Sequence, residues 1–530
     1  MTTQTMSKQL QGLMFCAVAL SLNACQQTQI VFTPSEPPSL AHFETPNSLA
    51  HSLPNSLNNP LGSSLNNHLP KSGVIIPVTD EIFTDEVHTE LDLSYQLHRL
   101  ASVQMNSSVS NRVSLAAVSP QVPFNNPDIL QIAFQEKARA LAISRADPCL
   151  ETFSMRVSLH SINLSLTCPD DVNHIYDLLL QFWQPDAFVD ATTTPVDVDN
   201  IRRQLKLNKH LNAFSGAEID KVWRDKLLGP EHPYNRVFNN NALFDSLSLR
   251  QLQQIQQQAV TQAQWHLFLP NSLANNAKFD LQASLKLWPI LPNSGPKVDK
   301  LETVKPQQIK RIYLIDAPGS VQTQVRLGYA IDHVLSDAST QQQQLNPQEV
   351  ALSCRSLSAL MGRSFSGRLY YDLREKRGLT YGIYGQCANA PLSSSIKFYG
   401  STAIEHTGAF VVGIVDHLTL VKTQGVSQGE IDALKTYLIG EDLLSQDNSI
   451  QRENQYIHQV AIGLTQVDVQ KLNTELQALT PERLQQLANG AFSGEPLIIL
   501  RGDVARILPD LKTKLPEWQF ERVKVGRTDN

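Results

Sequence analysis

Apolar residues recur along the chain with two periods, and the period changes from one segment to the next. Alternating apolar and polar positions predict strands, whereas apolar positions three and four residues apart predict helices. In the first half of the chain the predicted order is two strands, a helix, two strands, two helices and a strand. The strands are 91–100, 112–117, 153–159, 162–168 and 264–269, and the helices begin at Pro127, Val172 and Val198.

The second half repeats this order. The strands are 311–315, 324–330, 379–386, 395–401 and 497–503, and the helices are 347–361, 364–376, 407–423 and 428–442. Strands that follow each other without an intervening helix favour antiparallel pairing, so the predicted class is α+β with mainly antiparallel sheets. The repeat indicates two comparable domains, which we place at residues 75–295 and 296–530.

The N-terminal stretch has the organisation of a secretory signal. Residues 10–22 are mostly apolar but too few to span a membrane permanently. The following Leu-Asn-Ala-Cys, which ends at Cys25, resembles the bacterial lipobox, in which cleavage leaves a lipid-modified cysteine at the N-terminus. We expect a signal peptide over residues 1–24 and lipidation of Cys25, with an outer-membrane location favoured by Gln26. An ordinary signal peptide with an incidental cysteine is the alternative.

Residues 25–74 are rich in Pro, Ser, Asn and Leu and show no sustained period. This composition predicts a disordered tether that separates the folded part from the lipid surface by roughly 40 Å. We therefore expect the protein to contact a membrane through its lipid anchor alone.

Composition and charge narrow the possible partners. The chain has 530 residues, with 44 Lys and Arg against 50 Asp and Glu, so its formal net charge is −6. Nucleic-acid binding is disfavoured, since proteins that neutralise phosphates carry a basic excess. The apolar content of 42% is sufficient for two buried cores.

Of six cysteines, two lie in the N-terminal signal region. The other four are Cys149 and Cys168 in the first half, and Cys354 and Cys387 in the second. In an oxidising compartment each of these pairs is a candidate disulfide, and four buried free thiols are the alternative. A cysteine zinc site is disfavoured because no two of the four are closer than nineteen positions (168 − 149).

Four segments carry a family resemblance. The strongest is 366–384, SGRLYYDLREKRGLTYGIY, and the others are 229–236, GPEHPYNR, 425–435, GVSQGEIDALK, and 501–503, RGD. Together they resemble the pitrilysin/insulinase type of zinc peptidase, the family that includes mitochondrial processing peptidase. The resemblance covers about residues 75 to 510 and implies two tandem insulinase-like (LuxS/metallopeptidase-like) α/β sandwich domains.

Peptidases of this family carry His-x-x-Glu-His on a helix of the first domain. Both His bind zinc, the Glu activates water, and a later Glu completes the site. Here the fourteen His residues are never closer than nine positions (51 − 42), and the helix expected to hold the motif, 129–139, offers Glu136 and no His. No Glu lies between Glu151 and Glu218, and the helix expected to supply the later ligand, 200–209, is basic. We therefore expect no metal bound by this chain and no catalytic residue of its own.

In contrast to the zinc motif of the first half, the family segment of the second half, 366–384, is present. The resemblance implies that Arg374 and Tyr381 hold the substrate peptide near the zinc, where a guanidinium and a phenol can donate to a carbonyl. The residues alone allow a structural interpretation: Arg374 suits a helix C-terminus, Gly378 suits the residue after it, and Tyr381 suits a half-buried strand. His232 is expected to fix the geometry of its loop, with a metal role as the alternative.

These observations predict a lipid-anchored, non-catalytic subunit that binds peptides in the periplasm and pairs with a His-x-x-Glu-His-bearing peptidase subunit, which supplies the zinc, or with itself. Addition of the peptide to an edge strand is the expected mode of capture. The alternatives are an envelope binding or scaffold lipoprotein without a catalytic role, and a stand-alone metallopeptidase with unrecognised ligands. Fold analogy alone does not choose among them.

Overall fold

The computed structural model describes residues 83–88, 95–100, 111–120, 122–169, 172–183, 196–214, 216–239, 243–270, 307–331, 333–335, 342–344, 347–363, 366–446 and 449–524. All of them belong to one compact unit, Phe43–Asn530. The predicted signal peptide, Cys25, the tether and both predicted domain boundaries lie outside the described residues.

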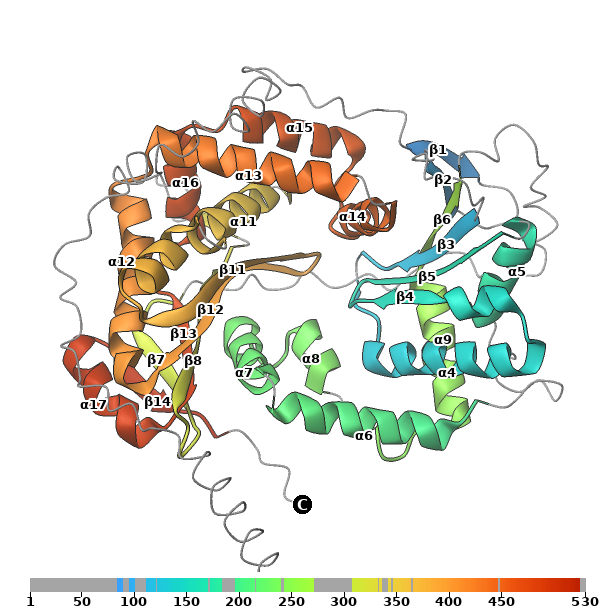
Figure 1. Cartoon of the computed structure of the whole chain (residues 1–530), viewed down its shortest axis with the longest axis horizontal. Helices are drawn as coiled ribbons and strands as arrows, with labels where there is room; N and C mark the ends of the chain where they lie inside the picture. The colour runs from blue at the N-terminus through green and yellow to red at the C-terminus, as the bar shows by residue number, and fades with distance from the viewer. Residues whose placement is uncertain are drawn as a thin grey trace, which may run out of the picture. The chain divides into compact units, whose positions relative to one another are not determined.

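The first half forms a six-stranded sheet in the order β1-β2-β6-β3-β5-β4 (Figure 1). The strands are β1 (Phe83–His88), β2 (Tyr95–Leu100), β3 (Asn111–Val118), β4 (Ser154–Val157), β5 (Ser161–Cys168) and β6 (Gln264–Pro270). The helices are α4 (Pro127–Arg145), the 3-10 helix η3 (Pro148–Thr152), α5 (Val172–Trp183), α6 (Val198–Phe214), α7 (Ala217–Leu228), α8 (Pro233–Asn239) and α9 (Leu249–Gln262).

The second half forms another six-stranded sheet, in the order β11-β12-β8-β13-β7-β14, and a two-stranded ribbon. The strands are β7 (Arg311–Asp316), β8 (Gln322–Ala330), β11 (Thr380–Ala390), β12 (Ser393–Ala403), β13 (Leu497–Gly502) and β14 (Gln519–Arg522), and the ribbon pairs β9 (His333–Leu335) with β10 (Gln342–Gln344). The helical segments are α11 (Pro347–Gly362), η6 (Tyr370–Lys376), η7 (Ile404–His406), α12 (Thr407–Thr423), α13 (Gln428–Gln446), α14 (Ser449–Ala461), α15 (Gln466–Gln477), α16 (Pro481–Ala491) and α17 (Val504–Lys514).

The four strands at one end of each sheet follow the same order, β6-β3-β5-β4 in the first and β13-β8-β12-β11 in the second. This confirms the α+β class and the repeat that the hydrophobic pattern predicts. Most strand pairs are antiparallel, but β2 with β6, β13 with β7 and β14 with β7 are parallel. Because each parallel pair is joined through helices, it could not be found by looking for adjacent strands in the sequence.

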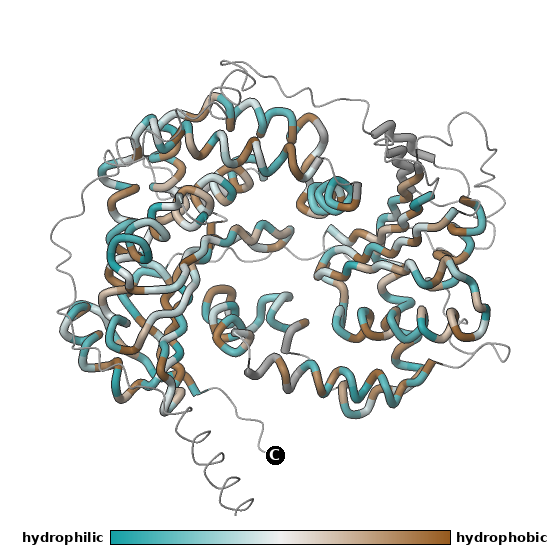
Figure 2. The backbone as a smooth tube through the Cα atoms, viewed as in Figure 1, coloured by the Kyte–Doolittle hydropathy of each residue, from teal (hydrophilic) through white to brown (hydrophobic). Residues whose placement is uncertain are grey.

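The central strands β3 and β13 are buried on both faces of their sheets. Along β3, Leu115 and Ala117 pack into the core formed with α4, α5 and α9, whereas Ala116 and Val118 face the opposite side. The alternation of Trp265, Leu267 and Leu269 in β6 would by itself indicate one buried face, but Phe268 is fully buried on the other face. Figure 2 shows apolar and polar segments alternating along the helices, as expected when each helix buries one face.

The second face of each sheet is covered by a helix from the other half. Tyr456 and Ile457 of α14 pack on the first sheet, beside Phe268. Ile219 and Trp223 of α7 pack in turn on the second sheet, in a cluster that includes Ile499. Each half therefore supplies one helix that packs on the sheet of the other half, so the burial of each sheet depends on both halves.

One helix among the described residues, Ile404–Thr423, is long and apolar enough to cross a membrane. Its residues Phe410, Ile414 and Leu418 are instead buried in the core of the second half. We interpret it as a core helix.

Candidate functional site

The helix expected to hold a zinc motif is α4, and it packs beside α6. The spacing His-x-x-Glu-His, applied to Glu136, places Ala133 and Lys137 at the two His positions. Ala133 has no ligand atom. Lys137 is 1% exposed, and its Nζ donates to the carbonyl of Phe182 at the end of α5, 2.8 Å away. Burial lowers the pKa of Lys137 well below the usual value for lysine.

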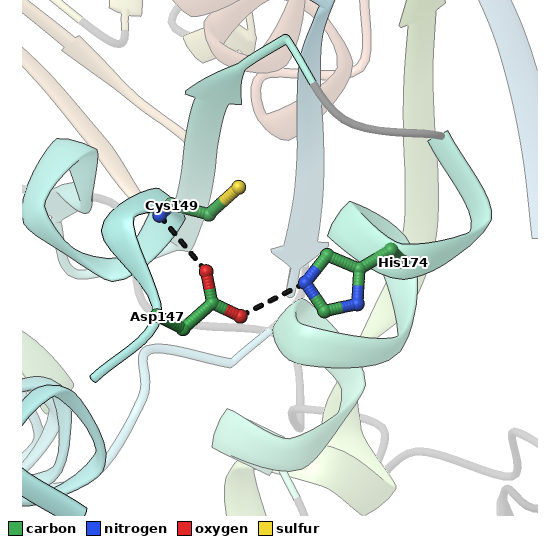
Figure 3. A group of neighbouring side chains, drawn as sticks. All are labelled: Asp147, Cys149 and His174. Atoms are coloured by element: carbon green, nitrogen blue, oxygen red, sulfur yellow. Dashed lines mark hydrogen bonds and ion pairs between the residues drawn. The ribbon is translucent and has the colours of Figure 1, made fainter. Parts of the chain in front are cut away.

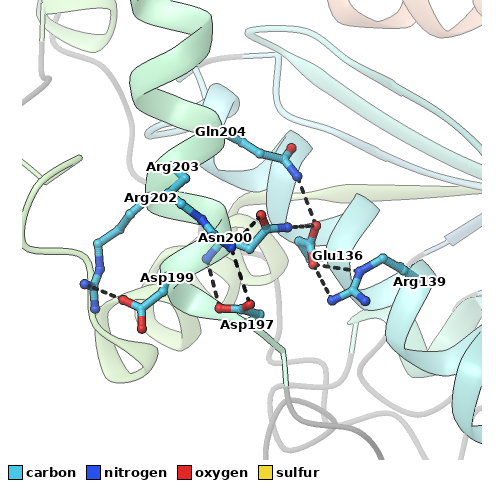
Figure 4. A network of polar contacts seen from close by, with 8 residues as sticks. All are labelled: Glu136, Arg139, Asp197, Asp199, Asn200, Arg202, Arg203 and Gln204. Atoms are coloured by element: carbon cyan, nitrogen blue, oxygen red, sulfur yellow. Dashed lines mark hydrogen bonds and ion pairs between the residues drawn. The ribbon is translucent and has the colours of Figure 1, made fainter.

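Glu136 is buried, and its carboxylate accepts four side-chain hydrogen bonds (Figure 4). Arg139 donates from Nε at 3.0 Å and from Nη2 at 2.9 Å to one oxygen. The other oxygen accepts from Gln204 Nε2 at 3.1 Å and from Asn200 Nδ2. Asn200 and Gln204 both come from α6, so the network ties α4 to α6 in the place where the resemblance puts a zinc ion.

The side chains at this place do not fit zinc. A zinc site needs thiolate, imidazole or carboxylate ligands, whereas amide N–H groups and a guanidinium are donors that cannot bind a cation. The single carboxylate already accepts from all of them, and Arg139 neutralises its charge. We therefore derive no catalytic step from this region.

In the part of the chain that the structure describes, one other group of neighbouring side chains includes the residue types of a metal site. Asp147, Cys149 and His174 bring their ligand atoms within 4.8 Å of one another (Figure 3). Cys149 is bonded to Cys168, however, and a disulfide sulfur has no thiolate to offer. Asp147 accepts from the amide of Cys149 at 2.9 Å and from His174 Nε2 at 2.8 Å. The cluster caps η3 and is not a metal site.

The segment with the strongest family resemblance begins with a short helical turn and ends in β11. The sequence predicts a helix over 364–376, and the structure shows a π-helix over its second part, η6. Such turns leave the regular hydrogen-bond ladder and are frequent at functional sites. Gly378, which follows η6, has φ 62°, so it confirms the predicted glycine after the helix end.

Two buried ion pairs hold this segment. Arg368 donates from Nε at 2.5 Å and from Nη2 at 2.9 Å to Glu430 at the start of α13. Asp372 accepts from Arg377 Nε at 2.9 Å and from His417 Nε2 at 3.0 Å. All four side chains in the ion pairs of Arg368 with Glu430 and Arg377 with Asp372 are at most 12% exposed.

These partners control the charge of the two carboxyls. Burial by itself raises the pKa of Asp372, but hydrogen bonds from His417 and Arg377 hold it below the ordinary value. Burial likewise raises the pKa of Glu430, and the hydrogen bonds and charge of Arg368, with the backbone and hydroxyl of Ser427, lower it overall. Both carboxylates are therefore ionised near neutral pH and fix the position of η6.

We call η6 with these two ion pairs the frame. Within it Arg374 is half-buried, and beside it Tyr381 is exposed. The Arg374 guanidinium lies over the ring of Tyr370 at 4.6 Å, and its side chain is 36% exposed. Tyr381 is 86% exposed. The interpretation of Tyr381 as a half-buried strand residue is therefore wrong. Tyr381 is exposed because it lies in a β-bulge.

The bulge lies at the first residues of β11. Thr380 pairs with Thr402 and Ile383 with Gly400, so Tyr381 and the following glycine together oppose one residue of β12. Thr380 Oγ1 donates to the carbonyl of Ser401 at 2.6 Å and accepts from the amide of Gly382 at 3.1 Å. A bulge re-aims the side chains that it carries, and here it leaves the Tyr381 ring in solvent.

The strand β11 is an edge strand, and it is fixed firmly to the helix behind it. Cys387 is disulfide-bonded to Cys354 of α11. A Cβ atom at Gly362 of α11 would lie 2.0 Å from the amide nitrogen of Gly385, so only glycine permits this approach. The other disulfide joins Cys149 to Cys168, as the sequence indicates.

The sheet face beside β11 carries aromatic and cationic side chains. Tyr384 lies against Tyr399 with ring centroids 5.6 Å apart, and Arg326 and Lys397 each lie 5.5 Å from the Tyr399 ring. Asp220 of α7 accepts from Arg326 and from Lys397, both at 2.8 Å. These cations are therefore used in attaching α7 to the second sheet.

The loop of residues 229–236 does more than keep its own geometry. Asn235 Nδ2 donates to the carbonyl of Gly229 at 2.7 Å, which closes the loop on itself. His232 and Tyr234 contact Leu392, in the turn between β11 and β12. No metal role is supported for His232, because its two ring nitrogens face a backbone amide and a backbone carbonyl.

Sequence reasoning missed the partners of Glu136 and the burial of Lys137. The spacing of the motif was the available signal: Ala133 and Lys137 stand three positions before and one after Glu136. Asn200 and Gln204 carry no such signal, since they lie 64 and 68 residues away and only folding brings them to Glu136.

The fold has two halves whose sheets share a strand order, and the described side chains around Glu136 do not form a zinc ligand set. Residues 277–438 match the family model described as "Peptidase M16 inactive domain". A segment of 144 residues is 24% identical to the uncharacterized zinc protease YmxG of Bacillus subtilis (strain 168), over 27% of this chain. The match spans 35%, about a third, of the length of that curated relative.

Solved structures share the fold over most of the chain. The peptidase M16 inactive domain from Pseudomonas fluorescens is 16% identical, with a TM-score of 0.59 over 79% of this chain and 98% of that one. A chain of complex III2 from Candida albicans is 10% identical, with a TM-score of 0.57 over 82% and 100%. The periplasmic protease PqqL from Escherichia coli is 13% identical, with a TM-score of 0.51 over 79% of this chain and 46% of that one.

Residues 277–438 are therefore similar to the Peptidase M16 inactive domain, and the chain has the M16-like fold. This confirms the resemblance to the insulinase type of zinc peptidase, in a form that lacks the zinc motif.

Proposed function

We propose that this protein is a non-catalytic, peptide-binding subunit of a zinc peptidase in the cell envelope. The observation that carries the proposal is the contrast between its two candidate sites. The Glu136 carboxylate accepts four hydrogen bonds from neighbouring side chains, whereas the half-buried Arg374 and the exposed Tyr381 lie on a frame held by buried ion pairs.

The edge strand β11 supports a mode of peptide capture. Its outer edge has no strand partner in the described sheet, and Tyr381 lies at its start. An extended peptide that pairs with such an edge gains backbone hydrogen bonds, while neighbouring side chains select among sequences. Arg374 and Tyr381 would then donate to carbonyl or carboxylate groups of the peptide.

The zinc would come from a partner subunit with His-x-x-Glu-His. The membership of one fold neighbour in complex III2 and the periplasmic location of another are properties of those proteins, and they agree with a subunit of an assembly in the envelope. Lipidation at Cys25 and the tether would hold this subunit on the periplasmic side of the outer membrane.

A pull-down tests the partner. The full chain, tagged at its C-terminus, is extracted from envelopes with mild detergent and purified. The proposal expects a second chain with His-x-x-Glu-His in stoichiometric amount. Recovery of this chain alone, or as an oligomer with itself and without peptide binding, contradicts it.

A binding assay tests the two side chains. With fluorescein-labelled casein peptides as an unfolded probe, Arg374→Ala and Tyr381→Phe should each weaken affinity roughly tenfold, the loss expected for one hydrogen bond to a charged group. Arg506→Ala is the matched control, because Arg506 is an exposed arginine of α17 that pairs with Glu405. Equal affinity in all variants would favour the alternative of an envelope scaffold lipoprotein.

A further inference from the structure

The hairpin of β11 and β12 is fastened at its turn by side chains from the first half. The turn is Pro391–Leu392, since Ala390 pairs with Ser393. The amide of Leu392 donates to Tyr234 Oη at 3.0 Å, and its carbonyl lies 3.4 Å from His232 Nε2. Both backbone groups of one turn residue are therefore bound by the 229–236 loop.

The contacts of His160 require one neutral form of its ring. His160 Nδ1 lies 2.6 Å from the carbonyl of Ser119, which can only accept, so Nδ1 carries a hydrogen. His160 Nε2 lies 2.8 Å from Tyr234 Oη. Because that oxygen accepts from Leu392, its own hydrogen is available for Nε2, which must then be unprotonated.

The contacts of His232 require the opposite neutral form. His232 Nδ1 accepts from the amide of Tyr234 at 3.2 Å, so it carries no hydrogen, and Nε2 carries the hydrogen that points to Leu392. A proton added at Nδ1 would face the hydrogen of the Tyr234 amide. A proton added to His160 at Nε2 would leave the Tyr234 hydroxyl hydrogen without that acceptor.

We propose that His160, His232, Tyr234 and Leu392 form a pH-sensitive latch, which holds the β11–β12 hairpin when both histidines are neutral and releases its turn when they take up protons. The latch itself rests on this geometry alone. Its consequence, a looser β11 and weaker peptide capture in acid, rests on the proposed function.

The surroundings of both rings favour the neutral form. His160 is 4% exposed, and burial lowers its pKa to about 4 against the opposing hydrogen bond to the Ser119 carbonyl. Burial also lowers the pKa of His232 against the opposing hydrogen bond to the Leu392 carbonyl. No charged side chain contributes to either pKa shift. Among the described residues, the titratable group that contacts both histidine rings is Tyr234.

The direction of the pH effect follows from these values. A histidine released into water has a pKa of 6.5, above that of His160 in the latch, so the released state binds more protons between pH 6.5 and 4. The latch is therefore complete above about pH 6.5 and weakens as the pH falls. For His160 alone, the ratio of released to latched protein should rise roughly thirtyfold between neutral pH and pH 5.

Hydrogen–deuterium exchange of the full chain, without any peptide, tests the latch. The observable is the protection of the segment around Leu392, corrected at each pH for the intrinsic exchange rate. Wild-type protection should fall by more than roughly thirtyfold between about pH 7.5 and pH 5, because His160 alone accounts for that factor and His232 adds to it. The strand β13 serves as the internal reference, and it should stay protected throughout.

Three variants separate the latch from ordinary acid effects. Tyr234→Phe removes the hydroxyl and should show low protection at every pH. His232→Gln can still accept through Oε1 and donate through Nε2 but does not titrate, so its loss of protection in acid should be smaller. His174→Gln changes a histidine outside the latch and should behave as the wild type. Wild-type protection that is independent of pH, or that falls together with that of β13, overturns the proposal.

Discussion

Buried carboxylates have different kinds of partners in the α4–α6 pair and in the η6–β11 segment. In the first, the Glu136 carboxylate accepts from Arg139, Asn200 and Gln204, and little of its hydrogen-bonding capacity remains. In the second, the ion pairs are buried, Arg374 is half-buried over the Tyr370 ring, and Tyr381 is exposed to solvent. The difference separates a region that only holds the fold together from one that can contact a ligand.

The Glu136 network also shows what joins α4 to α6 in the place where the family resemblance puts a zinc ion. A zinc ion would join α4 to α6 through their ligands, and the hydrogen bonds of Glu136 join the same two helices. Buried polar networks of this kind stabilise a fold only when their members are satisfied. The hydrogen bonds of Glu136 can therefore tie α4 to α6 without a metal ion.

The largest expected effect comes from breaking the frame of the second region. Glu430→Gln leaves the Arg368 guanidinium buried without a full negative partner. Removal of one partner of a buried ion pair costs about 3–5 kcal/mol, so the free energy of unfolding should fall by that amount. Chemical unfolding of the full chain measures it.

The matched control is Glu375→Gln, in the same segment. Glu375 is half exposed and lies 3.6 Å from Arg374, and an exposed pair contributes less than about 1 kcal/mol. A loss in Glu430→Gln no larger than in Glu375→Gln would show that the frame does not depend on the buried pair.

A smaller effect is expected in the first region. Glu136→Gln keeps an acceptor for Asn200 and Gln204 but loses the charge-assisted bonds from Arg139, at a cost of about 1–2 kcal/mol. Its unfolding should be compared with that of Glu475→Gln on the exposed face of α15, which should be unchanged. A stability equal to that of the wild type would mean that the network does not join α4 to α6.

The smallest expected effect is the loss of stability that acid causes through Asp372 and Glu430. It is absent near neutral pH. Asp372 and Glu430 have pKa values in the folded state below their ordinary 3.8 and 4.5, so the unfolded chain binds more protons in acid. Their contribution to stability is complete above the unfolded pKa values and is lost as the pH falls through the folded ones.

Unfolding curves of the wild type and Asp372→Asn measure this contribution. The wild type should lose more stability than the variant as the pH falls below about 4.5, and the two should keep a constant difference above it. Parallel loss over the whole range would assign the acid sensitivity to other groups.

Much of the fold follows from local pattern. The α+β class, the repeated order of strands and the pairing of Cys149 with Cys168 and of Cys354 with Cys387 agree with the structure. The reason is that strand alternation, helix periodicity and turn residues are local properties.

Other features depend on contacts that no local pattern contains. The apolar face of α14 is visible in the sequence, but its packing against Phe268 of the first sheet is not. The bulge that exposes Tyr381 depends on a register shift against Gly400, and the latch depends on His160, 74 residues from Tyr234. Such long-range pairings decide which polar residues are left free for function.

The zinc content of the full chain tests the central claim most directly. The purified protein is equilibrated with excess zinc, passed through a desalting column and measured for bound metal, with and without chelator. The account predicts a zinc-to-protein ratio near zero in both samples, because the α4–α6 region has donors in place of ligands. A ratio near one that falls with chelator, together with peptide cleavage by this chain alone, would contradict it.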